Sequence, residues 1–136
     1  MQNRVITKVL GMMCLIFSVT MLPPVAVSWL YGDGEHGAFL AAFAAIGATG
    51  LVLWLANVRV KRDLRYRDGF MVVVLSWMVL GLLGSIPLYL VDQANLGITD
   101  AVFESVSGLT TTGATVLTGI DQLPASLLYY RQQLQW

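Results

Sequence analysis

Charged residues are scarce in this sequence of 136 residues. Lysine, arginine, aspartate and glutamate together make up 12% of it, whereas 57% of the residues are hydrophobic and the mean hydropathy is +0.71. Soluble domains carry about 25% charged residues, so this shortage indicates helices that cross a lipid bilayer. The eight basic and eight acidic residues balance, and we expect no nucleic-acid partner for a neutral chain.

Cysteine and histidine are nearly absent. Cys14 is the only cysteine, which excludes an internal disulfide and a cysteine-based metal cluster. It lies within an apolar run, where a packed or lipid-facing thiol is expected rather than a reactive one. His36 is the only histidine and has no companion ligands for a metal ion. Since no nucleophile, base and acid could act together in the membrane, the sequence predicts no enzyme and no resident cofactor.

Three apolar segments, at about residues 9–31, 37–58 and 69–91, are long enough to span the bilayer. A signal peptide is the alternative for the first segment, because Arg4 and Lys8 precede it. This first segment has about 23 apolar residues, whereas the apolar region of a signal peptide usually has about 7–15 residues. No clear cleavage site follows it either. The three segments therefore predict three transmembrane helices.

Prolines and small residues predict the shape and packing of these helices. Pro23 and Pro24 predict that the first helix is kinked or loosened in its outer third, and Pro87 predicts an end or a bend in the third. Small residues at spacings of three and four predict close packing. They are Ala38, Ala41, Ala42, Ala45 and Thr49 in the second helix, and Gly81, Gly84 and Ser85 in the third.

The positions of the basic residues predict the orientation. Residues 59–68 hold five of the eight lysines and arginines, and Arg4 and Lys8 raise this to seven. By the positive-inside rule this loop and the N-terminus are cytoplasmic, while the acidic turn at Asp33 and Glu35 and the later Asp92 lie outside. Binding of nucleic acid or of lipid headgroups is the alternative for the basic run.

A fourth apolar segment, residues 98–109, is too short to cross the membrane. Thr99 is a plausible N-cap, and Asp100 suits the positive first turn of a helix. We therefore expect a re-entrant helix that starts outside and dips into the membrane. Pro124 suits the first position of a further helix, whose residues 125–136 would form the outer half of a fourth span.

The predicted fold class is thus an all-α integral membrane protein. It has three transmembrane helices, a re-entrant pore helix with an extended filter, and the start of a fourth transmembrane helix.

Hydroxyl and glycine residues follow the short segment at Thr110, Thr111, Thr112 and Gly113. In an extended strand, carbonyl and threonine oxygens could replace the water around a dehydrated ion, and glycine permits the backbone angles this needs. A divalent-cation site would normally present a carboxylate here, so a monovalent cation is expected. The alternative is a Thr-rich external loop that binds no ion.

Glu104 is an acid within an apolar membrane segment, which makes it a functional candidate. We expect it to support the filter from behind, by bonding backbone amides. The alternatives are a cation vestibule, or a surface carboxylate that pairs with a neighbour.

The sequence resembles the Trk/Ktr/HKT superfamily of potassium transporters. The likeness lies in the phrases RDGF, DAVFES, LTTTGAT and YRQQLQW, at residues 67–70, 100–105, 109–115 and 130–136. It implies two extra N-terminal helices in residues 1–68, followed in 69–136 by the first, truncated, of four helix–pore-loop–helix repeats around one pore.

Residue roles also follow from the resemblance. It implies that Thr111 and Thr112 coordinate K⁺, with Thr110 and Gly113 beside them, and that glycine at position 113 accompanies potassium permeability. Phe103-Glu104-Ser105 looks like the pore-helix signature, and Arg131 and Trp136 look like the outer start of the next helix.

The implied function is potassium uptake across a bacterial inner membrane. The implied partners are a second copy in a homodimer and a cytoplasmic nucleotide-binding gating subunit of TrkA type. One loop cannot encircle an ion, so we expect a longer chain with three further repeats. The alternative is a non-conducting membrane assembly subunit.

Overall fold

The computed structural model of this chain describes residues 3–32, 34, 36–91 and 95–135. Its helices are α1 (Asn3–Val19), α2 (Leu22–Tyr31), α3 (His36–Ala56), α4 (Tyr66–Leu90), α5 (Ile98–Leu109), the short 3₁₀ helix η2 (Ile120–Gln122) and α6 (Ala125–Leu134). No strand occurs within these described ranges, and the all-α prediction is confirmed. The predicted positions of Asp33, Glu35, Asp92 and Trp136 lie outside the described residues.

Three helical stretches in the described residues are long and apolar enough to cross a membrane. They are Asn3–Tyr31, which contains α1 and α2, and the helices α3 and α4. This confirms the three predicted spans. Each begins earlier than its apolar run, because flanking polar residues such as Arg4 and Arg67 continue the helix.

The first span is interrupted rather than only kinked. α1 ends at Val19, and α2 starts at Leu22 with Pro23 and Pro24 in its first turn. Proline has no N–H, so Pro24 cannot donate to the carbonyl of Thr20 as a continuous helix would require. Gln133 of α6 donates an Nε2–H to that carbonyl at 2.5 Å. A side chain from a distant segment thus supplies the hydrogen bond that the break removes.

α1 and α3 cross closely at two glycines. A Cβ added at Gly50 would lie 2.8 Å from the main-chain oxygen of Gly11, so only glycine allows this approach. The buried positions of α3 are Phe39, Ala42, Ile46 and Gly50. The predicted packing face was therefore wrong at Ala41, Ala45 and Thr49, which are exposed. Small residues occur on more than one side of α3, and contact with α1 selects one side.

In α4 the predicted patch of Gly81, Gly84 and Ser85 is buried, as expected. Pro87 does not end the helix, which continues to Leu90. Of the predicted end or bend, the end is contradicted, because a proline lacks only its own N–H and the residues after it can still donate helical hydrogen bonds. The amide of Val91 still donates to the Pro87 carbonyl at 3.1 Å.

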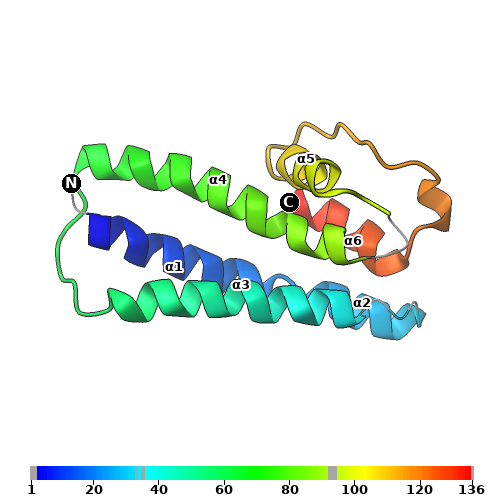
Figure 1. Cartoon of the computed structure of the whole chain (residues 1–136), viewed down its shortest axis with the longest axis horizontal. Coiled ribbons are helices and arrows are strands. Elements are labelled where there is room, and N and C mark those ends of the chain that lie inside the picture. The colour runs from blue at the N-terminus through cyan, green and yellow to red at the C-terminus, as the bar shows by residue number, and fades with distance from the viewer. Residues whose placement is uncertain (1–2, 33, 35, 92–94, 136) are drawn as a thin grey trace.

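Figure 1 shows how the ends of the bundle differ. The start of α1 and the basic connection between α3 and α4 lie at one end of the long helices, whereas α5, the connection that follows it and α6 lie toward the other. α5 runs across the long helices instead of along them (Figure 1). Its N-cap is Gly97, not the predicted Thr99, and Pro124 caps α6 instead of occupying its first position.

Candidate ion-coordination site

The predicted filter begins where α5 ends. The amide of Thr111 donates to the Gly108 carbonyl at 3.0 Å, and the amide of Thr112 donates to the Ser107 carbonyl at 2.9 Å. This pair of bonds is a Schellman motif, whose left-handed residue is usually glycine. Here Thr111 occupies it with a φ of 57°. A left-handed conformation costs a residue with a Cβ roughly 1–2 kcal/mol, so the surrounding bonds hold Thr111 in a strained backbone.

Four successive main-chain oxygens after the helix have no hydrogen-bond donor in the described part of the chain. No described residue donates a hydrogen bond to the carbonyls of Thr110, Thr111, Thr112 or Gly113. All four residues are exposed. Gly113 also has a positive φ, of 76°. These four carbonyl oxygens thus belong to exposed residues and accept no hydrogen bond from the described residues.

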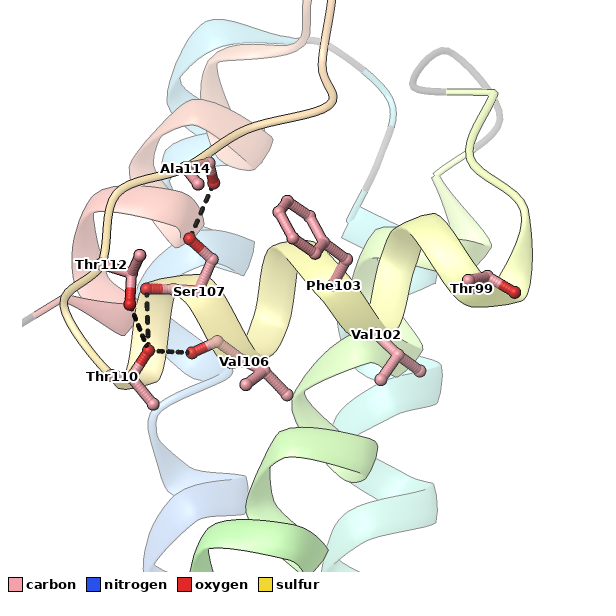
Figure 2. A pocket seen from close by; sticks show the side chains of 8 residues that line it. All are labelled: Thr99, Val102, Phe103, Val106, Ser107, Thr110, Thr112 and Ala114. Atoms are coloured by element: carbon pink, nitrogen blue, oxygen red, sulfur yellow. Dashed lines mark hydrogen bonds between the residues drawn. The ribbon is translucent and has the colours of Figure 1, made fainter.

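The threonine hydroxyls are not equivalent (Figure 2). The hydroxyl of Thr110 donates to the Val106 carbonyl at 2.7 Å, and its oxygen lies 2.8 Å from that of Thr112. Thr110 is therefore turned back toward α5. Among the described residues, the hydroxyl of Thr111 has no hydrogen-bond partner.

A pocket with a volume of about 410 Å³ lies between α5 and this loop (Figure 2). Its lining is mostly apolar on the α5 side, with hydroxyls from the loop end, and consists of Thr99, Val102, Phe103, Val106, Ser107, Thr110, Thr112 and Ala114. In the part of the chain that the structure describes, no three His, Cys, Asp or Glu side chains come together as metal ligands.

Glu104 is buried behind the loop. Its Oε1 accepts hydrogen bonds from the Thr115 hydroxyl at 2.5 Å, from the Val116 amide at 2.6 Å and from the Leu117 amide at 3.3 Å. A carboxylate that accepts several main-chain bonds fixes the strand that donates them. The residues it holds follow the predicted filter and do not belong to it.

Arg131 of α6 is the partner of the other carboxylate oxygen. Its Nε lies 3.4 Å from Glu104 Oε2, with side chains 15% and 3% exposed, respectively. Two of the roles considered for Glu104 therefore occur together in the structure. One carboxylate oxygen accepts hydrogen bonds from backbone amides, and the other pairs with Arg131. Sequence reasoning did not find this pair, although Arg131 is the one basic residue outside the predicted cytoplasmic segments and an acid in apolar surroundings needs a partner.

α6 is anchored to α4 near the same place. The hydroxyl of Tyr130 donates to the Gly84 carbonyl at 2.6 Å. The Tyr130 ring also meets Phe39 edge-on, with centroids 5.5 Å apart. Because Tyr130 and Arg131 are adjacent, these contacts position the guanidinium that pairs with Glu104.

These features define a multi-pass helical membrane protein with a short helix, α5, and an irregular loop inserted between α4 and α6. The family model described as TrkH, cation transport protein, matches residues 35–136. The chain belongs to this TrkH family of cation transport proteins, which confirms the family resemblance in the sequence.

Individual proteins that are similar to this chain agree with the assignment to the TrkH family. The chain is 54% identical over all its residues to the Trk system potassium uptake protein TrkH of Halomonas elongata, and it spans 28% of the length of that protein. It is 37% identical over 98% of its length to the Trk system potassium uptake protein TrkG of Escherichia coli K12, and covers 27% of it. The crystal structure of the potassium transporter TrkH from Vibrio parahaemolyticus matches with a TM-score of 0.95 and 49% identity, over 100% of this chain and 29% of that one. The names of these relatives describe transporters and not enzymes.

Proposed function

We propose that this chain contributes one of four pore loops to a potassium-uptake pathway across the bacterial inner membrane. The observation that carries the proposal is the run of four main-chain oxygens from Thr110 to Gly113, to which no described residue donates a hydrogen bond. The printed names of the relatives, which are potassium uptake proteins, support the choice of ion.

The chemistry of the loop suits a monovalent cation. An ordinary extended strand turns successive carbonyls to opposite sides, and positive φ at Thr111 and Gly113 removes that alternation. In the proposed site these carbonyls and the Thr111 and Thr112 hydroxyls replace the water around K⁺, with Thr110 and Gly113 completing the ligand run. The C-terminal end of α5 adds a partial negative charge. Glu104 supports the loop from behind, and Arg131 balances its charge.

The rest of the proposed architecture follows from the geometry of a pore. One loop cannot surround an ion, so the pathway requires three further loops, which additional repeats of the same polypeptide would supply. In this arrangement residues 1–68 are two accessory helices and a basic loop, and 69–136 form the first repeat. The basic loop and the N-terminus face the cytoplasm, where a nucleotide-binding gating subunit of TrkA type would bind, and the assembled protein is a homodimer.

The main test substitutes both ligand threonines. Thr111→Ala combined with Thr112→Ala, made in the full-length product of the gene that encodes this chain, is expected to reduce K⁺ uptake by more than about tenfold, since each lost ligand costs on the order of 1 kcal/mol. Uptake is measured in cells that lack other potassium uptake systems, and assembly is measured by size-exclusion chromatography. A non-conducting assembly subunit predicts the opposite result, with normal assembly and no uptake to lose.

Gly113 provides a second test. Gly113→Asp is expected to abolish growth on low potassium, because it places a charge and a strained side chain within the ligand run. Gly113→Ser is expected to raise sodium flux relative to potassium. Gly119 is a matched control, since it also has a positive φ (61°) and open space around a Cβ. Equal effects of serine at Gly113 and Gly119 would count against carbonyl-based selection at Gly113.

A further inference from the structure

Ser107 contacts the filter loop at both ends of its turn. Its carbonyl accepts the amides of Thr112 at 2.9 Å and Gly113 at 3.4 Å. Its hydroxyl donates to the carbonyl of Ala114 at 2.7 Å (Figure 2). The side chain is buried in the last turn of α5, so one residue of the helix holds the loop by its main chain and by its side chain.

The hydrogen bond to Ala114 marks a boundary in the loop. The four preceding carbonyls have no donor among the described residues, whereas the fifth is held against the helix by Ser107. A carbonyl that accepts a short bond from a buried hydroxyl is turned away from an ion on the open side of the loop. The number of free oxygens is thus set by a side chain that touches no ion.

We propose that Ser107 is a positioning residue for ion selectivity, which ends the ligand run at Gly113 by fixing the Ala114 carbonyl. This inference rests on the proposed function of the loop. Without the hydroxyl, the Ala114 carbonyl is free to turn toward the ion, and the spacing of the other oxygens loses one of its restraints. A filter with an additional and less restrained oxygen discriminates less well between cations of different size.

α5 offers a matched control in Ser105. It lies one helical half-turn before Ser107 and is fully buried, but its hydroxyl has no hydrogen-bond partner in the described part of the chain. Ser105→Ala removes a buried hydroxyl from the same helix without releasing any carbonyl. Ser107→Ala and Ser105→Ala therefore both remove a buried hydroxyl from α5, but only Ser107→Ala removes a hydrogen bond to the loop.

The experiment measures the ratio of K⁺ to Na⁺ uptake by the full-length gene product in proteoliposomes. Loss of one hydrogen bond corresponds to about a fivefold change in an equilibrium, so Ser107→Ala is expected to lower the ratio about fivefold while protein yield and assembly stay normal. Ser107→Thr keeps a hydroxyl and is expected to restore the ratio, and Ser105→Ala is expected to leave it unchanged. Ser107→Cys keeps the volume with only a weak donor and serves if the alanine variant folds poorly.

A wild-type ratio in Ser107→Ala and Ser107→Cys would overturn the proposal, as would a ratio in Ser107→Thr as low as that in Ser107→Ala. These outcomes are distinct from failure of the proposed function. That failure would appear as no K⁺ uptake by the unaltered protein, or as unchanged uptake after substitution of Thr111 and Thr112.

Discussion

Replacing Glu104 by glutamine removes the negative charge that joins α5, the end of the filter loop and α6. The change preserves the size of the side chain, and an amide oxygen can still accept the bonds from Thr115, Val116 and Leu117. The amide nitrogen, however, then faces the Nε–H of Arg131, and two donors oppose each other.

The expected loss in the free energy of unfolding follows from the burial of the Glu104–Arg131 ion pair. Removing one partner of a buried ion pair costs about 3–5 kcal/mol, because the other charge stays buried without compensation. Arg131 retains 15% exposure, which places the loss near the lower limit. The bonds from the Val116 and Leu117 amides also weaken, since hydrogen bonds to neutral acceptors contribute about 1 kcal/mol less than those to charged ones. We expect Glu104→Gln to lower the free energy of unfolding by about 5 kcal/mol in total.

The assay is denaturant unfolding of the purified full-length gene product in detergent, together with a double-mutant cycle. Arg131→Gln alone should be about as destabilising as Glu104→Gln, and the double variant should lose clearly less than the sum, because it leaves no unpaired charge. Asp100→Asn is the control, since Asp100 lies on the same helix but is exposed and contributes less than about 1 kcal/mol through the helix dipole. Equal stabilities of Glu104→Gln and Asp100→Asn, or strictly additive effects in the cycle, would refute the reasoning.

Two further predictions concern packing. Gly50→Ala places a Cβ 2.8 Å from main-chain atoms of α1 and is expected to lower the free energy of unfolding by about 1–3 kcal/mol through overpacking. Gly47→Ala is the control, because its Cβ would meet Ser18 Oγ at 3.5 Å, and it should be neutral or slightly stabilising. Thermal unfolding compares the two variants. Tyr130→Phe removes the bond to the Gly84 carbonyl but keeps the contact with Phe39, so a loss of about 1 kcal/mol is expected. Tyr129→Phe, at an exposed neighbour, should change stability by less than about 0.5 kcal/mol, and similar unfolding midpoints for the two tyrosine variants would contradict the role assigned to the Gly84 bond.

The helical spans and the short helix could be predicted because their causes are local. The 12 residues of α5 were predicted with the bounds that the structure has, Ile98 to Leu109, since the apolar run ends there and is followed by three β-branched threonines, which lower helix propensity. Local rules also located the break in the first span at its prolines, although a kink was expected and an interruption is found.

Contacts between distant segments could not be predicted in the same way. The packing face predicted for α3 included Ala42, which is buried, but also Ala41, Ala45 and Thr49, which are exposed, because spacing alone does not distinguish between two sides that both carry small residues. Similarly, Glu104 was expected to bond amides, but neither the residues that donate to it nor its partner Arg131 could be read from their positions along the chain.

The sequence by itself determined the class of this protein, its three membrane-spanning segments and the place of the Thr-Thr-Thr-Gly loop, because hydropathy, segment length and helix termination are set by neighbours along the chain. Only the tertiary structure decided which oxygens of the loop are free. The Ala114 carbonyl is bonded by the Ser107 hydroxyl, which only the folded loop brings to it. In the same way, the packing of α6 brings Arg131 to Glu104 and Gln133 to the carbonyl of Thr20, a residue 113 positions away. A polar group in apolar surroundings must find a partner, and packing in three dimensions determines which partner it finds.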